Sequence, residues 1–158
     1  MLGAYAVGKT SLVSRFVRSL FSEKYHTTVG VKVDKKTVTV GDQEVSLMLW
    51  DLAGEDHFYQ VKMSYLRGSA GYLLVADGMR RSTLEKAIEL QERTEREIGK
   101  VPFILVINKL DLIDDWEIKE PDLSTIPPGD WQVVSTSAKT GSGVNEAFMA
   151  LSRRLLAP

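Results

Sequence analysis

The sequence has no cysteine among its 158 residues. This absence excludes disulfides, thiolate metal sites, catalytic thiols and the lipid anchors that are attached to cysteine. The start, Met1-Leu2-Gly3, also lacks the glycine in second position that N-myristoylation needs. The apolar runs are too short to cross a bilayer, and no secretory signal is recognisable. We therefore expect a cytoplasmic protein without a lipid anchor.

The chain also lacks an excess of charge of either sign, since 20 Lys and Arg stand against 21 Asp and Glu. Such a balance creates no strong field toward nucleic acid, so no nucleic-acid partner is expected. A hydrophobic content of 44% at this length suits one globular domain. No repeat or linker interrupts the chain, which predicts a single domain over residues 1–158.

Short apolar runs predict the buried strands. Runs of this kind are typical of strands that are covered on both faces in a parallel sheet. They alternate with segments of helical periodicity, which predicts a doubly wound α/β domain. The runs are residues 45–50, 71–76, 103–107 and, shorter, 132–134.

A more polar, β-branched segment, Lys32–Val40, precedes the first of these runs. The turn Gly41-Asp42 joins the two, which predicts an antiparallel hairpin at the sheet edge. The proline-rich segment 120–130 is expected to be a surface loop.

Apolar residues at helical spacing predict three helices, over residues 12–20, 84–98 and 144–155. Ser82-Thr-Leu-Glu85 has the pattern of a capping box at the start of the second helix. Gly99 is expected to end that helix, because glycine adopts the conformations that stop a helix at little cost.

The opening stretch, Gly3-x-x-x-x-Gly8-Lys9-Thr10, fits the phosphate-binding P-loop pattern. Small residues let successive backbone N–H groups curl around phosphate oxygens, and the following helix offers its positive end. Lys9 is expected to reach the β- and γ-phosphates and Thr10 to ligate Mg²⁺. A plain glycine turn before a helix is the alternative. The residues expected to line the phosphate site are Tyr5, Ala6, Val7, Gly8, Lys9, Thr10 and Ser11.

Only Met1 and Leu2 precede this loop, although a P-loop normally follows a central strand. A missing strand would leave inner strands unpaired, at about 0.5–1.5 kcal/mol for each lost hydrogen bond. The first strand is thus expected to be nearly absent from this chain, and the natural chain to begin upstream of Met1.

Four further segments carry polar residues to strand ends or the loops beside them: Thr27–Gly30, Trp50–Gly54, Asn108–Asp111 and Ser137–Lys139. Ligands bind at this edge of an open α/β sheet. With the P-loop, these segments resemble the motifs of the Ras superfamily of small GTPases, closest to its Rab-like branch, over nearly the whole chain. The lack of a cysteine-bearing tail is similar to prokaryotic or other non-lipidated members, and equally to a trimmed domain.

The resemblance implies a P-loop NTPase fold of the small G-protein type, with a mostly parallel six-stranded sheet and helices on both faces. It implies a molecular switch that cycles between GTP and GDP states and hydrolyses GTP with Mg²⁺. Two alternatives stay open. One is a GTP-binding scaffold with little or no hydrolysis, and the other is the G domain of a larger multidomain protein.

Guanine recognition is expected from Asp111, because a carboxylate accepts both parallel donors of guanine, N1–H and N2–H₂. Adenine offers no such pair and leaves the carboxylate unmatched. The resemblance implies that Asn108 ties the loops together and that the Lys109 stem covers the ring. It also implies that Ser137, Ala138 and Lys139 bind the nucleotide, with the Ala138 N–H donating to the guanine O6.

Two aromatic residues complete the expected pocket. The resemblance places Phe21 edge-on against the base, and packing at the end of the first helix is its alternative role. It places Tyr25 over the γ-phosphate, with a half-exposed loop aromatic as the alternative.

The resemblance also implies the metal site and the switch. Thr28 would join Thr10 on Mg²⁺, Asp51 would hold the ion through water, and Gly54 would donate its N–H to the γ-phosphate. Hydrolysis removes these contacts, so that the segments around Thr28 and Gly54 relax. The residues implied in catalysis are Lys9, Thr28, Gly54 and Glu55.

Partner proteins are expected at the same segments. An effector, an exchange factor and a GTPase-activating protein, none identified, would bind regions 25–33 and 54–67. Trp50, Tyr65 and the apolar face near Val29 resemble an effector patch, although Trp50 and Tyr65 have simple packing as their alternative.

Two positions depart from the family. Glu55 stands where most members have the glutamine that orients the attacking water, and a carboxylate accepts but does not donate a hydrogen bond. Tyr5 stands where the best-known members have glycine. His57 is a candidate to position the attacking water instead, and an ordinary surface histidine is the alternative. Normal binding with slow intrinsic hydrolysis is therefore expected. An internal arginine finger has five candidates that spacing does not separate, namely Arg15, Arg18, Arg67, Arg80 and Arg81.

Overall fold

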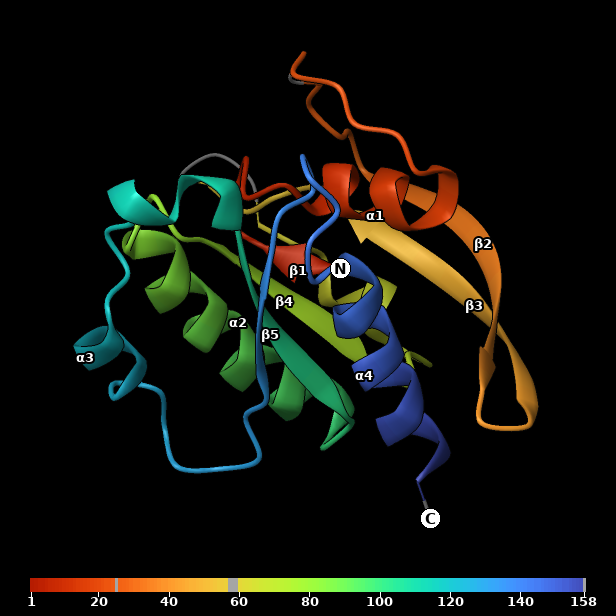
Figure 1. The fold of residues 1–158 in the computed structure, drawn as a ribbon. Helices are drawn as coiled ribbons and strands as arrows, with labels where there is room; N and C mark the ends of the chain where they lie inside the picture. Colours follow the sequence, from red (N-terminus) through yellow and green to blue (C-terminus); the bar gives the residue numbers. More distant parts are fainter. Residues whose placement is uncertain (25, 57–59, 158) are drawn as a thin grey trace.

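The computed structural model describes residues 1–24, 26–56 and 60–157. Its elements alternate as the sequence predicts (Figure 1). They are β1 (Leu2–Gly3), α1 (Lys9–Arg18), β2 (Val31–Val40), β3 (Gln43–Leu52), η1 (Met63–Leu66), β4 (Tyr72–Asp77), α2 (Ser82–Ile98), β5 (Phe103–Asn108), η2 (Leu110–Asp115), α3 (Glu120–Leu123), β6 (Val133–Thr136) and α4 (Val144–Leu156).

The central sheet is parallel, with strand order β1-β4-β5-β6. The first strand is short but present, since Leu2 pairs with Leu74 and Gly3 with Val75 of β4. This sheet confirms the α/β prediction and the P-loop context, because the loop follows a strand end and leads into α1.

The hairpin β2–β3 forms a second, antiparallel sheet with register from Val31↔Leu52 to Val40↔Gln43. The six predicted strands are thus found, in two hydrogen-bonded groups. Because β1 has only two residues, it offers few backbone groups to β3, and the Met1 nitrogen donates to the Trp50 carbonyl (2.9 Å).

The expectation that run 45–50 is buried on both faces is wrong. Met48 is 58% exposed and Trp50 45%, because β3 belongs to the hairpin and not to the parallel sheet. A two-stranded antiparallel sheet covers one face and leaves the other in water.

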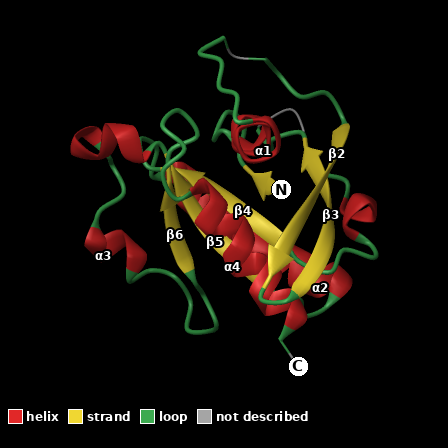
Figure 2. Ribbon diagram, turned by 45° about the vertical axis from the view of Figure 1, so that its right-hand side comes forward, coloured by secondary structure: helices red, strands yellow, loops and turns green. Residues whose placement is uncertain are grey.

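Helices cover both faces of the parallel sheet, α2 on one and α1 with α4 on the other (Figures 1 and 2). The inner strands β4 and β5 alternate between two cores. Leu74 packs with Leu90 of α2, whereas Val75 packs in the cluster that holds Phe16 of α1 and Phe148 of α4. The rings of Phe16 and Phe148 stack at 4.0 Å.

The predicted helices are found, with one correction at the start of α2. Ser82 is the first helical residue and makes no cap, so the capping box does not form. The Thr83 hydroxyl instead donates to the Arg80 carbonyl (2.6 Å). Gly99, with φ 82°, ends the helix as predicted.

The segment 120–130 contains the short helix α3 and is otherwise irregular. In the described part of the chain, no helix has both the length and the apolar character needed to cross a membrane.

Candidate functional site

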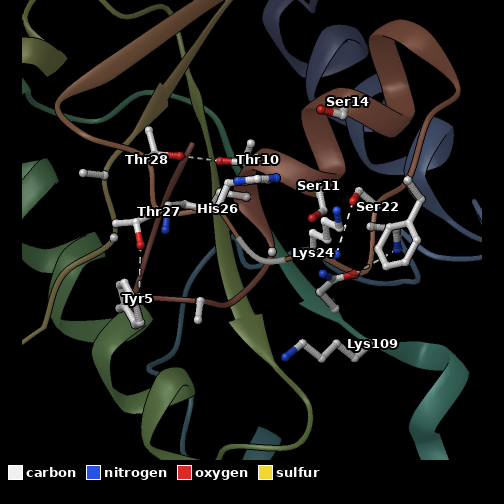
Figure 3. Close-up of a pocket in the computed structure, with 18 of the residues that line it drawn as sticks. Tyr5, Thr10, Ser11, Ser14, Ser22, Lys24, His26, Thr27, Thr28 and Lys109 are labelled. Carbon is white, nitrogen blue, oxygen red and sulfur yellow. Dashed lines mark hydrogen bonds between the residues drawn. The ribbon is translucent and has the colours of Figure 1, made fainter.

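A pocket of about 650 Å³ opens where the P-loop meets the carboxyl ends of the strands (Figure 3). Its volume lies in the range of small-molecule sites. Most of the residues expected around a nucleotide line it: Tyr5, Ala6, Gly8, Lys9, Thr10, Ser11, Phe21, Thr28, Gly54, Asn108, Lys109, Asp111, Ala138 and Lys139.

Four expected residues lie behind the pocket wall. The side chains of Val7 and Ser137 are fully buried, and Asp51 and Glu55 are also buried. Tyr25 lies outside the described residues.

The P-loop is shaped by close contact with Asn108–Asp111, the predicted base-recognition segment. Gly8 has φ 100°, and a Cβ there would lie 2.3 Å from Nδ2 of Asn108. That Nδ2 donates to the Val7 carbonyl (3.1 Å). Only glycine fits at position 8, because the conformation and the space both exclude a side chain.

Lys9 begins α1 and points back across the loop. Its Nζ donates to the carbonyls of Gly3 (3.3 Å) and Ala4 (3.0 Å). Burial lowers the pKa of Lys9 to about 8, partly offset by the nearby Asp51. The ammonium is a buried cation at the point where phosphate oxygens are expected.

The three predicted metal ligands meet at the other side of the loop. The Thr10 Oγ1 donates to Oδ2 of Asp51 (2.6 Å) and shares a hydrogen bond with Oγ1 of Thr28 (2.6 Å). The second oxygen of Asp51, Oδ1, is buried and has no hydrogen-bond partner among the described residues. An oxygen set with an unsatisfied carboxylate fits Mg²⁺, which prefers hard oxygen ligands and retains water.

At the base end, Asn108 ties the loops together as expected. Its Oδ1 accepts from the Thr136 hydroxyl (3.0 Å) and the Ala138 N–H (3.3 Å). Ser137 donates its hydroxyl to Oδ1 of Asp111 (2.7 Å), which orients that carboxylate. Thr136, 28 residues from Asn108, carries no motif that points to this role.

Arg15 of α1 supports the same end. Its guanidinium donates to the carbonyl of Ala138 (2.8 Å) and to that of Lys139. Arg15 is thus engaged away from the phosphates, and three other finger candidates pair with acidic residues. Arg18 pairs with Asp34, Arg67 with Glu97 and Arg81 with Asp122.

Glu55 does not bring its carboxylate to the pocket. The side chain is 2% exposed and accepts from Nη1 of Arg93 in α2, with 2.8 Å to each oxygen. The N–H of Val61 also donates to it (3.0 Å), and Lys86 lies 3.9 Å away. The expected water-positioning role therefore gains no support from the position of this carboxylate. The substitute candidate, His57, lies outside the described residues.

The backbone of Glu55 joins the P-loop instead. The Tyr5 N–H donates to the Glu55 carbonyl (2.8 Å), and the Glu55 N–H donates to the Gly3 carbonyl (3.2 Å). A Cβ on Gly54 would lie 2.6 Å from the Tyr5 Cα. Glycine at position 54 lets the two segments approach this closely.

The Tyr5 side chain lies over the phosphate end of the pocket. Its hydroxyl is 3.4 Å from Oγ1 of Thr27, next to the predicted metal ligand Thr28 (Figure 3). The Tyr5 carbonyl accepts from Nη2 of Arg80 (2.7 Å).

The structure distinguishes between the alternative roles of the aromatic residues. Phe21 lines the pocket and belongs to neither core cluster, which favours the expected place beside the base. Tyr65 packs against the α2-side core, whereas Trp50 stays exposed on β3.

The Ras family profile matches residues 1–157. The chain is 34% identical to Ras-related protein Rab-4A of Rattus norvegicus over 158 residues, covering 99% of this chain and 72% of the relative. It is 34% identical to Rab-4 of Dictyostelium discoideum (99% and 77%) and 32% identical to RABF2b of Arabidopsis thaliana (98% and 78%). Members of this family bind GTP and GDP, generally with Mg²⁺. The chain belongs to the Ras family as a Rab-like small GTPase, a GTP-binding protein that hydrolyses GTP and acts as a molecular switch.

Proposed function

We propose that the pocket holds GTP with its phosphates in the P-loop and its base against Asp111. The observation that carries the proposal is the meeting of Thr10, Thr28 and Asp51, with the Asp51 Oδ1 left unsatisfied. A buried carboxylate oxygen without a partner costs free energy unless a ligand such as a cation compensates it.

At the phosphate end, Lys9 exchanges its bonds to the Gly3 and Ala4 carbonyls for phosphate oxygens. The N–H groups at the start of α1 face the same oxygens. Thr10, Thr28 and Asp51 hold Mg²⁺, the last of them through water. When bound there, the ion would supply positive charge against the phosphates.

At the base end, Asp111 accepts the two guanine donors while Ser137 keeps its carboxylate in place. The Lys109 stem covers one face of the ring and Phe21 meets its edge. Selection against ATP follows, because adenine leaves the Asp111 carboxylate unmatched.

Hydrolysis by the chain alone is slow in this proposal. The Glu55 carboxylate is held by Arg93 and Val61 and does not face the pocket. Transition-state stabilisation then rests on Lys9, Thr28 and the Gly54 N–H. A missing contact of this kind lowers the rate by about 10²–10³-fold.

Partner proteins bind regions 25–33 and 54–67 in this proposal. Val29 is 89% exposed, and Val33 and Trp50, partners across the hairpin, are exposed beside it. An exposed apolar surface next to a segment that responds to the γ-phosphate is suited to an effector that distinguishes GTP from GDP. An exchange factor and a GTPase-activating protein would act on the same segments.

Single-turnover GTP hydrolysis, measured with binding titrations of GTP, GDP and ATP, tests the proposal. We expect guanine nucleotides to bind far more tightly than ATP, phosphate release to be slow, and Asp51→Ala to weaken binding only when Mg²⁺ is present. Equal affinity for GTP and ATP would overturn the assignment of Asp111. Tight binding without any phosphate release would place hydrolysis under the control of a partner.

A further inference from the structure

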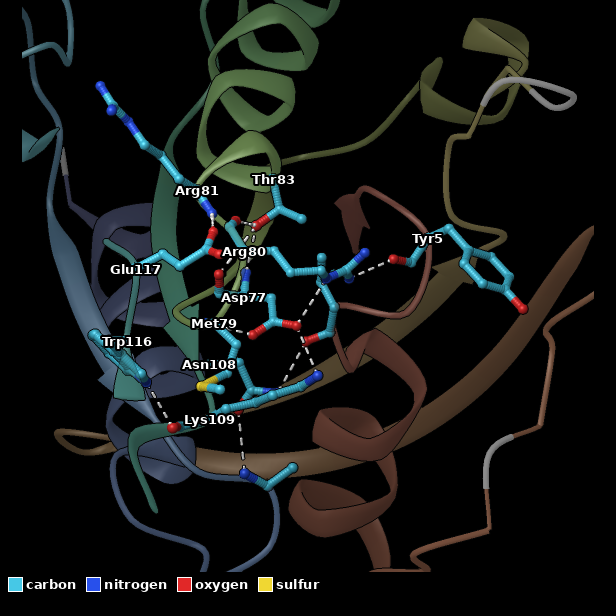
Figure 4. Close-up of polar contacts among 12 residues, drawn as sticks. Tyr5, Asp77, Met79, Arg80, Arg81, Thr83, Asn108, Lys109, Trp116 and Glu117 are labelled. Atoms are coloured by element: carbon cyan, nitrogen blue, oxygen red, sulfur yellow. Dashed lines mark hydrogen bonds and ion pairs between the residues drawn. The ribbon is translucent and has the colours of Figure 1, made fainter. Parts of the chain in front are cut away.

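Arg80 is the one finger candidate with a hydrogen bond to the P-loop in the described chain. It follows β4 and precedes α2, and its guanidinium spans two acceptors. The Nη2 donates to the Tyr5 carbonyl (2.7 Å), and the Nε donates to Oδ2 of Asp77 (3.1 Å) (Figure 4). Arg80 is not among the residues that line the pocket, so it contacts the P-loop from the side that faces away from the pocket.

The Asp77 carboxylate, which accepts from Arg80, is a buried hub of hydrogen bonds. Asp77 is 1% exposed, and its Oδ1 accepts from the Met79 N–H (2.9 Å). Its Oδ2 accepts from Arg80 and also from Nζ of Lys109 (2.7 Å), a residue of the base-recognition segment. One buried carboxylate therefore supports both the phosphate-binding loop and the base-binding loop.

The neighbouring Trp116 secures the same segment. Its Nε1 donates to the Lys109 carbonyl (2.8 Å), and its ring lies where a Cβ on Gly78 would be, 2.1 Å from the nearest ring atom. Asp77 and Lys109 are thus held by packing as well as by charge, which makes the hub a rigid support for Arg80.

The bond to the Tyr5 carbonyl decides where the next N–H points. In a planar trans peptide the C=O of Tyr5 and the N–H of Ala6 point in opposite directions. The hydrogen bond to Arg80 keeps the Tyr5 oxygen on the side away from the pocket, so the Ala6 N–H is directed toward the pocket. Ala6 has φ 61°, a left-handed conformation that strains a residue other than glycine. A peptide under such strain needs an external contact to keep it from rotating.

We propose that Arg80 is a positioning residue for nucleotide binding, which holds the Tyr5–Ala6 peptide in its phosphate-binding orientation. Asp77 anchors Arg80 and, through Lys109, couples the phosphate end of the pocket to the base end. The inference rests on the nucleotide lying in the pocket as proposed above.

The test compares two adjacent arginines. Arg80→Met removes the contact to the P-loop, whereas Arg81→Met removes a surface arginine that pairs with Asp122. Both variants are loaded with GDP and Mg²⁺, and dissociation of GDP is followed by exchange against excess nucleotide. We expect Arg80→Met to release GDP about tenfold faster and Arg81→Met to match the wild type.

Two further readouts separate positioning from a general loss of structure. The ³¹P resonance of the β-phosphate of bound GDP should move in Arg80→Met and stay in place in Arg81→Met, while far-ultraviolet circular dichroism stays the same in both. Arg80→Lys, with one ammonium in place of two separated donors, should recover part of the lost affinity. It also serves as the test variant if Arg80→Met does not fold.

Equal release rates and equal ³¹P spectra in the Arg80 and Arg81 variants would overturn the inference and leave the proposed function standing. Failure of the wild type to bind GDP would refute the proposed function, and the role of Arg80 with it.

Discussion

At the base end of the pocket, Asn108 bonds to Val7, Thr136 and Ala138, and its side chain is buried. At the switch segment, Val29 is 89% exposed, and Thr28 reaches the P-loop through the hydroxyl of Thr10. The base end is therefore buried and tied together by hydrogen bonds, whereas the residues around Thr28 are exposed. A binding site that is rigid at one end and adjustable at the other suits a switch that retains its base while it senses one phosphate.

The segment after Gly54 is the second expected switch segment, but it is anchored in the way the base end is. Its backbone pairs with the P-loop, and the Glu55 side chain is anchored to Arg93 of α2. One of the two expected switch segments thus begins from a fixed point that does not depend on the γ-phosphate. The predictions below test how far rigidity and response are separated in the pocket.

The largest effect is expected at the rigid end, from Asp111→Ala. The variant loses both acceptors for guanine, so the preference for GTP over ATP should fall on the order of 10³-fold. Competition binding of the two nucleotides measures the ratio. Ser22→Ala, a change at a pocket-lining residue that makes no proposed contact to the base, is the control. A preserved ratio in Asp111→Ala would mean that the base is recognised elsewhere.

At the adjustable end, Thr10→Ala removes a hydroxyl from the proposed Mg²⁺ site. We expect roughly 10–100-fold weaker GDP binding with Mg²⁺, and little difference from the wild type once EDTA has removed the ion. Ser14→Ala, in the same helix and also lining the pocket, should bind GDP as the wild type does. A defect in Thr10→Ala that persists in EDTA would point to a loss of loop structure instead.

The anchor of the segment after Gly54 is tested by Arg93→Met. This change leaves the Glu55 carboxylate buried without its main partner, which costs about 3 kcal/mol. Thermal unfolding should then shift down by roughly 6–12 °C. The rate of intrinsic GTP hydrolysis should change little, because neither side chain faces the pocket.

The matched comparison is Arg96→Met, a change in the same helix at an arginine whose Nε donates to the Glu92 carbonyl of that helix. It should leave the unfolding temperature nearly unchanged. A large change in hydrolysis rate for Arg93→Met, at unchanged nucleotide affinity, would bring Glu55 back into catalysis.

A pH dependence of stability is expected from Lys9, whose pKa burial lowers to about 8. The unfolded chain, with an ordinary lysine pKa of 10.5, binds more protons than the folded protein between these values. Stability therefore rises with pH from about 8 to 10.5. Urea unfolding of nucleotide-stripped protein at several pH values measures the rise. Lys9→Met should lack this contribution, and identical pH curves would contradict the shift.

Much of the fold was predictable from local sequence. The apolar runs locate β4, β5 and β6, and the periodic segments locate α2 and α4, because these elements are defined by side-chain spacing within a few residues. The burial of β3 and the cap of α2 were predicted wrongly. Both depend on which neighbour an element has, since β3 pairs only in the hairpin and Ser82 already lies inside the helix.

Within the pocket, the sequence predicts the phosphate, metal and base segments, because each is a short stretch whose spacing is typical of its chemistry. Tertiary structure alone decided how these segments are supported and where Glu55 points. Arg93 lies 38 residues from Glu55, and Arg80 lies 75 residues from Tyr5. Contacts between such distant residues arise only when the strands order themselves in the sheet, so no local pattern could reveal them.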